Sequence, residues 1–303
     1  MQIMEMARGC NQSFEELPSI DQQLTFSKLS IELIRVLGIE QLNRDILKTL
    51  ELYSDQNGFN NAAALLADTN SFKGIDIIRF GNSINEIMER KSLENISILL
   101  QMEQCIQMFH QYYRYEKIEG MDRKSVDKIP ERDFREAVAN ALVHRMWDIP
   151  ASIKISMYSD KIEISSPGGL PAGISEDEYL NGQISLLRNP IIGNVFFRLK
   201  YIEKFGTGIM RINYAYKDAL IKPDYHIFSN SIQIILPVIK SDYKLNETEK
   251  KLLNILKING SMTRNEIEKA AEIDKSKAIR GLNRLIEKKM IQKRDLGRGT
   301  KYE

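Results

Sequence analysis

The sequence has 303 residues and contains few of the residues that build special scaffolds. Its two cysteines, Cys10 and Cys105, are too few for a disulfide framework, and neither they nor the three histidines show metal-ligand spacing. The dense apolar stretches, such as 232–239, are far shorter than the ~18–20 residues that a membrane-spanning helix needs. Residues 1–10 contain Glu5 and lack the apolar centre of a secretory signal. These absences argue against a disulfide-rich secreted domain or a membrane protein, and they predict a cytoplasmic location.

Internal repeats and low-complexity segments are also missing. The sequence contains no Gly-x-x-x-x-Gly-Lys-Ser/Thr phosphate loop, which argues against a helicase motor. Hydrophobic residues make up 43% of the chain and charged residues 28%, as is typical of a soluble globular protein. The length of 303 residues predicts about two domains.

The net charge of +2 hides an asymmetry along the chain. Residues 241–303 contain 16 Lys and Arg against 10 Asp and Glu, a net charge of +6, so residues 1–240 together carry −4. A basic C-terminal segment suits a polyanionic partner. The alternative is a solvated charged surface that binds no ligand.

Hydrophobic periodicity predicts the elements of the first 240 residues. Residues 1–25 are polar and irregular, and we interpret them as a strap or linker. Helices are expected within 26–52, at 60–67, at about 92–115, from 131, at 191–200 and from 209. Strands are expected at 74–80, 151–158, 161–165 and 231–238, with a long loop at about 172–188. This mixture predicts one α+β domain over residues 26–240, with a helical N-terminal part.

Residues 241–303 show a different pattern, with three short helices followed by a basic hairpin. Asn246 with Glu249, and Thr263 with Glu266, have the spacing of helix capping boxes. Gly260 stands where a C-terminal cap belongs. The third helix is expected at about 275–289. Such an order predicts a winged helix-turn-helix domain.

Basic residues at helical spacing occupy the side of this third helix opposite its apolar stripe. Placed in a major groove, they would contact phosphates and present arginine to guanine edges. The alternative is a winged helix used for dimerisation or protein contact. The expected DNA-binding residues are Lys275, Lys277, Arg280, Arg284 and Lys288 on the helix, and Arg294, Arg298 and Lys301 on the wing.

Glu136, Asn140 and His144 follow one another at intervals of four, so they project from one side of the helix that begins near 131. A carboxylate, an amide and an imidazole in a row suit Mg²⁺ and water beside a polyphosphate. Two glycine loops follow. Gly168 and Gly169 come after a strand, and 206–208 (Gly-Thr-Gly) opens a helix, where backbone N–H groups favour phosphate.

These motifs resemble the Bergerat-type ATPase fold of gyrase, histidine kinases and MutL. The segments 134–145 (FREAVANALVHR), 162–171 (IEISSPGGLP), 188–190 (RNP) and 205–212 (FGTGIMRI) are similar to one narrower family. It comprises prokaryotic transcriptional regulators related to the C-terminal region of the RecG helicase. Members often begin with a Schlafen-type AlbA-like domain. Because 11–20 resembles the strap that follows it, this sequence is expected to start near where that domain would end, as a natural short form or a fragment.

The resemblance implies roles for individual residues. Glu136 would be the water-activating base and Asn140 the Mg²⁺-holding amide. With His144, the loop residues Gly168, Gly169, Gly206, Thr207 and Gly208 would hold ATP. The sequence departs from the pattern at Ser165-Ser166-Pro167, where those ATPases carry an aspartate that recognises the adenine amino group.

The leading hypothesis is a bacterial regulator that binds double-stranded DNA, with a degenerate ATPase-like domain as a sensor or oligomerisation platform. A small molecule or nucleotide would be its effector, and a homodimer is expected. One rival is an ATPase that uses ATP and Mg²⁺. Another is an interaction scaffold with neither activity, whose winged helix contacts a protein partner. For the central domain alone, the alternative is a fold that has lost its nucleotide, in which Arg135 and Arg145 beside Glu136 form a structural ion pair.

Overall fold

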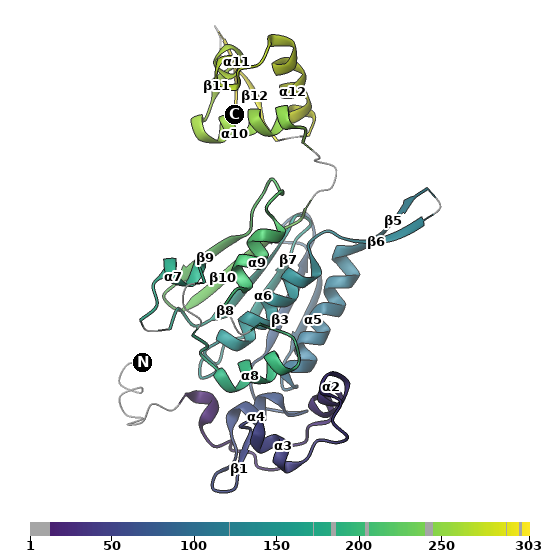
Figure 1. Ribbon diagram of the computed structural model, residues 1–303, viewed down its shortest axis with the longest axis vertical. Helices are drawn as coiled ribbons and strands as arrows, with labels where there is room; N and C mark the ends of the chain where they lie inside the picture. Colours follow the sequence, from purple (N-terminus) through teal and green to yellow (C-terminus); the bar gives the residue numbers. More distant parts are fainter. Residues whose placement is uncertain are drawn as a thin grey trace. The chain divides into compact units, whose positions relative to one another are not determined.

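The structure is a computed structural model that describes residues 13–303 except 121, 172, 183–185, 204–205, 240–244, 289 and 297–298. Contacts divide the chain into two units, Met1–Ile239 and Lys240–Glu303 (Figure 1), and each is described by itself. No helix in the described part of the chain is long and apolar enough to cross a bilayer.

A six-stranded mixed sheet forms the centre of the first unit, with the strand order β4-β3-β7-β8-β10-β9. Strands β3 and β7 are parallel, and the other neighbours are antiparallel. The strands are β3 (Ile75–Phe80), β4 (Ile87–Leu93), β7 (Ile153–Met157), β8 (Lys161–Pro167), β9 (Asp224–Phe228) and β10 (Ser231–Pro237). Alternating apolar residues such as Ile153, Ile155 and Met157 point into the core, because successive side chains of a strand face opposite sides. The α+β prediction is confirmed for this unit.

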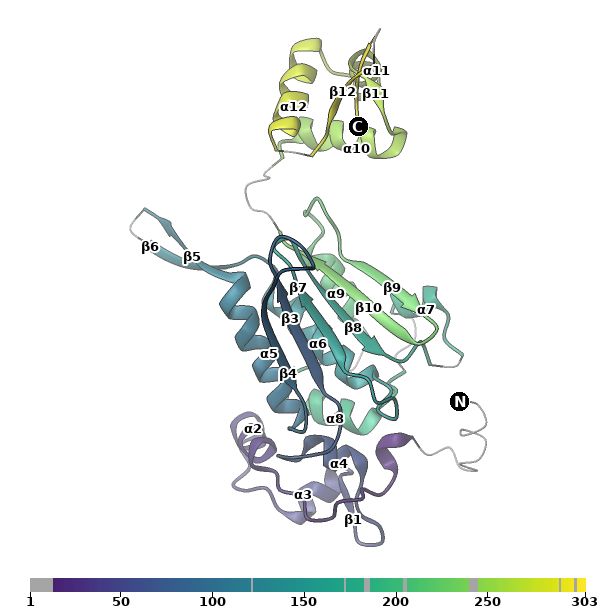
Figure 2. The same cartoon turned by 180° about the vertical axis from the view of Figure 1, so that it is seen from behind.

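Helices cover one face of the sheet. Figure 2 shows the sheet from its other face. They are α5 (Ile98–Tyr113), α6 (Glu131–His144), α8 (Pro190–Arg198) and α9 (Gly208–Ala215). Phe109 of α5 stacks on Phe134 of α6 with ring centroids 4.7 Å apart. The predicted helix at 92–115 begins later than expected, because β4 extends to Leu93 and Ser97 caps α5 by accepting from the Leu99 N–H.

The N-terminal part packs against the helices α5 and α8 of this layer. Its elements are η1 (Phe14–Glu16), α2 (Ser27–Leu37), α3 (Arg44–Thr49), β1 (Tyr53–Ser54), β2 (Gly58–Phe59) and α4 (Asn61–Leu66). Glu15 is completely buried, and its carboxylate accepts from the N–H groups of Ile191 and Ile192 at 2.6 and 3.0 Å. A carboxylate from the first described segment therefore caps the N-terminus of α8.

Several elements were not predicted from the sequence. β5 (Arg114–Glu119) and β6 (Asp122–Asp127) form a separate two-stranded hairpin. The loop expected at 172–188 contains α7 (Glu176–Leu180), which Ser175 caps. β9 was also missed, since its apolar and polar residues do not alternate clearly in the sequence.

The second unit contains α10 (Glu247–Asn259), α11 (Arg264–Ala271) and α12 (Lys275–Glu287) with a small sheet of order β11-β13-β12. Its strands are β11 (Met262–Thr263), β12 (Lys293–Leu296) and β13 (Gly299–Tyr302). Both predicted capping boxes are present, at Asn246–Glu249 and Thr263–Glu266. A Cβ on Gly281 would come within 2.5 Å of Leu252 Cδ1, so glycine lets α12 approach α10 closely.

Candidate functional site

Helix α6 brings together three of the predicted site residues. Asn140 Nδ2 donates to Glu136 Oε1 at 3.3 Å, one turn apart. A Cβ on Gly208 would lie 2.2 Å from Glu136 Oε1 and 3.1 Å from Asn140 Nδ2. The first turn of α9 therefore rests on these two side chains only because residue 208 is glycine.

A small apolar cavity lies beside Asn140, where the resemblance places adenine. Its volume is about 40 Å³, and Asn140, His144, Ser166 and Tyr179 are among its lining residues. A space of this size holds a few water molecules at about 10–15 Å³ each, whereas pockets for drug-sized ligands measure roughly 300–1,000 Å³. Ser166 already donates its hydroxyl to the carbonyl of Ala141 at 2.8 Å. The site does not fit an adenine ring in this conformation.

His144 is the third residue of the α6 row, and it lines this cavity rather than the polar side of the site. The edge of its ring faces Tyr179 at a centroid distance of 6.4 Å. Burial, together with the Arg188 guanidinium, lowers the pKa of His144 to about 4. The imidazole is therefore neutral at pH 7 and offers no positive charge to a phosphate.

The first glycine loop is held by the chain itself. Gly168 has a φ of +108°, and its N–H donates to the carbonyl of Asn230 at 2.9 Å. The Gly169 carbonyl accepts from Arg188 Nη2 at 2.6 Å, and Arg188 Nε donates to the His144 carbonyl at 3.0 Å. Asn189 bonds the carbonyls of Val143 and Arg145. The predicted Arg-Asn-Pro motif thus fastens the end of α6 to this loop.

The second glycine loop lies at the opposite end of the row. Gly206 has a φ of +63°, and Thr207 precedes α9 without capping it through its side chain. Thr207 Oγ1 is buried and bonds no group in the described part of the chain. Residues 204–205, which include Phe205 of the motif, lie outside the described residues.

An open polar cavity of about 400 Å³ adjoins Glu136. Arg211 forms an ion pair with Glu203 at 3.0 Å in its wall. Its ionisable lining residues are Glu131, Arg132, Arg135, Glu136, Lys200, Tyr201, Glu203 and Arg211. Four cationic side chains thus face three carboxylates, so the cavity is only weakly basic.

The electrostatics of Glu136 depend on burial more than on ion pairing. Burial raises the pKa of Glu136, while the Asn140 amide and the Arg211 guanidinium partly oppose this effect. Arg135 instead lies 3.8 Å from Glu131 and over the ring of Tyr201.

Arg145 also has other partners. It is buried, donates to the carbonyls of Gly74 and Ala151, and stacks on Trp147 at 4.2 Å. The hypothesis of a structural ion pair between Glu136 and Arg135 or Arg145 is therefore wrong, because both guanidinium groups are directed to other partners.

Asp133 belongs to the same helix face and was not identified from the sequence. It is 3% exposed, and its Oδ2 has no hydrogen-bond partner among the described residues. Burial raises the pKa of Asp133 to about 7. The spacing of three residues before Glu136 was the available signal, since it places both carboxylates on one side of a helix.

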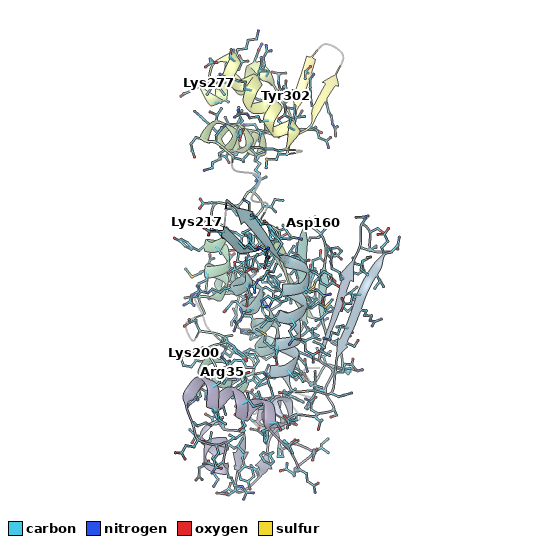
Figure 3. The ribbon with its side chains drawn as sticks, turned by 90° about the vertical axis from the view of Figure 1, so that its right-hand side faces the viewer. Arg35, Asp160, Lys200, Lys217, Lys277 and Tyr302 are labelled. Carbon is cyan, nitrogen blue, oxygen red and sulfur yellow. The ribbon has the colours of Figure 1, made fainter. Side chains whose placement is uncertain are left out.

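In the second unit, basic side chains lie exposed along α12. Lys277 points away from the helices of its unit (Figure 3) and lies 3.7 Å from Asp274. Lys275 and Arg280 are exposed, and the Arg284 side chain is 58% exposed. Lys277, Arg280 and Arg284 lie on one exposed side of α12, whereas Lys275 in its first turn projects in another direction.

Lys288 is less exposed than these residues and is paired with an acid of α10. Its Nζ lies 2.8 Å from Glu249 Oε2, and the side chains of Lys288 and Glu249 are 21% and 2% exposed. The Lys288 ammonium, the Asn246 backbone N–H and the Arg284 guanidinium oppose the effect of burial and lower the pKa of Glu249. No pattern in the sequence indicated that a buried acid on α10 would pair with this lysine.

On the hairpin, Arg294 pairs with Glu303 at 2.5 Å, and Lys301 lies opposite Arg294 on β13. Arg298 lies outside the described residues. Two of the three predicted hairpin cations are thus placed side by side.

The mixed sheet with helices on one face is an α+β arrangement that is consistent with an ATPase-like domain. Residues 151–236, which include β7 to β10, match a family model described as "Putative ATP-dependent DNA helicase recG C-terminal". The match supports the resemblance to proteins related to the RecG C-terminal region, although α6 and the second unit lie outside it.

The chain is also similar to the solved structure of the DIP2311 protein from Corynebacterium diphtheriae. The TM-score is 0.66 at 18% sequence identity, and the alignment covers 99% of this chain and 66% of that one. At this identity the likeness shows the fold alone. Comparison with curated proteins gave no match.

Proposed function

We propose that this protein is a transcriptional regulator whose second unit is a winged helix that binds double-stranded DNA. The open basic surface of α12 is the observation that carries the proposal. Residues 241–303 have a net charge of +6, which favours a polyanion. The neighbouring β12–β13 hairpin provides Arg294 and Lys301 for flanking phosphates.

The middle of α12 has the side chains for reading bases. Arg280, Asn283 and Arg284 are exposed on neighbouring turns of one face. Arginine recognises guanine and asparagine recognises adenine through paired hydrogen bonds in the major groove. Because Lys288 is committed to Glu249, base reading falls to the residues between 276 and 284.

For the first unit we propose a role as sensor or oligomerisation platform without turnover of ATP. The 40 Å³ cavity, the neutral His144 and the internally bonded Gly168–Gly169 loop all support this role. Oxygens of Glu136 and Asn140 would be the ligands for Mg²⁺ only together with a nucleotide phosphate. We therefore assign no catalytic step to Glu136.

The DNA proposal is tested by replacing Arg280 and Arg284 with alanine together. Anisotropy on a duplex of about 30 base pairs is measured across a salt series, because each lost phosphate contact lowers the salt slope by about 0.9. We expect weaker binding and a slope smaller by up to about 2.

The matched control replaces Lys251 and Lys257 of α10, which removes the same charge from the same unit. Equal losses in both variants would show that only net charge matters and would reject α12 as the reading helix. No measurable duplex binding by the unmodified chain would favour the interaction scaffold instead.

The proposal for the first unit is tested by thermal unfolding with and without millimolar Mg²⁺-ATP. A ligand at 100 times its dissociation constant adds about 2.7 kcal/mol to stability, which raises the midpoint by several degrees. We expect no shift. A clear shift that Asn140→Ala abolishes would instead support the ATP-dependent alternative.

A further inference from the structure

The β5–β6 hairpin, residues 114–127, is the feature of the first unit that its own core does not explain. Its two strands pair with each other and with no other strand in the described part of the chain. In Figures 1 and 2 it stands away from the sheet and the helices. The Tyr115 and Ile118 side chains are 36% and 68% exposed. A two-stranded ribbon is marginally stable in water, so this arm needs a surface to lie on.

The charge of the arm selects the chemical class of its partner. It contains four basic residues and four acidic residues, so its net charge is zero. A ribbon that enters a nucleic-acid groove needs an excess of lysine and arginine. Balanced charge around exposed Tyr115 and Ile118 therefore points to a protein surface.

An apolar corner at the start of β4 provides such a surface. Ile84, Ile87 and Met88 are 69%, 58% and 70% exposed. Tyr112, just before the arm, donates to Glu89 of β4, so the base of the arm lies next to this corner. Three exposed apolar side chains within five residues, at the start of an edge strand, make this segment a candidate contact site.

We infer that two copies of this chain associate, with the arm of each copy lying across the β4 corner of the other. Because arm and corner adjoin in one chain, a twofold axis forms both contacts at once. Residues 84–88 and 114–127 together approach the roughly 20 residues a side of a stable interface. An unrelated partner that contacted only the arm would bury a much smaller surface area.

The test measures the mass of the full chain in solution by light scattering and sedimentation, with Ile118→Asp on the arm and Met88→Asp on the corner. A control, Ile31→Asp, changes a residue of α2 that is 59% exposed. We expect the unmodified chain and the control to be dimers. Each of the other variants should raise the dimer dissociation constant roughly 100-fold, because each substitution enters the interface twice.

Disulfide trapping tests the pairing itself. In a Cys10→Ser background, an Ile118→Cys chain is mixed with a Met88→Cys chain, while Cys105 stays buried. A cross-linked species should form in the mixture and much less in either chain alone. A monomeric unmodified chain at tens of micromolar, or a dimer that survives both aspartate variants, would overturn the inference. DNA binding by a single α12 surface does not depend on this outcome.

Discussion

At the scale of single residues, the first unit buries a charged side chain whose partners the sequence does not reveal. Arg145 lies next to His144 in the chain, yet it turns away from the site and serves the backbone carbonyls of Gly74 and Ala151. Burial lowers the pKa of Arg145 to about 10, so it stays charged at pH 7. A buried guanidinium that keeps its hydrogen-bond partners stabilises the fold, so we assign Arg145 a structural role.

Replacing Arg145 with methionine should destabilise the protein by about 3–5 kcal/mol, because several buried carbonyls lose their donor at once. Urea unfolding at pH 7 measures this difference. The matched variant Arg135→Met removes a half-exposed guanidinium near Glu131 and should cost at most about 1 kcal/mol. Similar losses in the two variants would contradict the role given to Arg145.

The buried Asp133 carboxyl predicts that the stability of the folded protein depends on pH. Its folded pKa of about 7 lies above its ordinary value of 3.8, so the folded state holds this proton more tightly than the unfolded state. Its contribution to stability is therefore complete below about pH 4 and is lost as pH rises to 7.

Asp133→Asn should remove this loss. Its stability advantage over the unmodified protein should grow between pH 4 and pH 7 and level off at about 2–4 kcal/mol, since each pKa unit is worth about 1.36 kcal/mol. Urea unfolding at pH 4, 5.5, 7 and 8 tests this. A constant difference across the series would show that Asp133 titrates normally.

At the scale of elements, the contact between α6 and α9 depends on Gly208. Its Cα faces Glu136 and Asn140 so closely that any side chain must displace them. Gly208→Ala should therefore cost about 1–3 kcal/mol through overpacking.

In a Glu136→Ala background the same change should cost under about 1 kcal/mol, because the crowding atom is gone. Denaturation of all four proteins in this double-mutant cycle measures the coupling. Additive costs would mean that Gly208 is needed for its backbone and not for this contact.

In the second unit, the contact between α10 and α12 separates residues that stabilise the fold from those that we propose to bind DNA. Lys288→Met should weaken this unit by about 1.5–3 kcal/mol, the usual value of a charged hydrogen bond, because Glu249 loses its nearer cation while Arg284 stays 3.7 Å away. Hydrogen exchange of α10 and α12 amides in the full chain measures the loss. Arg280→Met should leave exchange unchanged and lower the salt slope of DNA binding by about 0.9. If Lys288→Met instead lowered the salt slope and left exchange unchanged, Lys288 would belong to the proposed DNA-binding surface.

At the scale of the whole molecule, the arm and the basic α12 surface predict a link between assembly and DNA affinity. If two copies pair through their arms, a duplex with two half-sites engages both α12 helices, whereas one half-site engages one. Replacing 115–126 with Gly-Gly should weaken binding to the double site at least about 10-fold and leave the single site unchanged. Titrations of both duplexes measure these affinities. Equal losses of affinity on the two duplexes would show that the arm does not link assembly to DNA binding.

Local signals predicted much of the fold. The capping boxes at Asn246 and Thr263 set helix starts because their bonds span three residues. Alternation in 151–158 and 161–165 predicted two strands of the central sheet, which the structure has at Ile153–Met157 and Lys161–Pro167. The β5–β6 hairpin and β9 were missed, because exposed strands do not need an apolar face and leave weak patterns.

By itself, the sequence determined where most helices and several of the central strands form, that Glu136 and Asn140 share one helix face, and that the C-terminal segment is basic. These properties depend on spacing of a few residues and on composition. Only the tertiary structure decided that the cavity beside Asn140 measures 40 Å³, that Arg145 serves backbone carbonyls and that Lys288 turns to Glu249. Each of these outcomes joins residues from separate elements, and packing of the whole chain sets the distances between them.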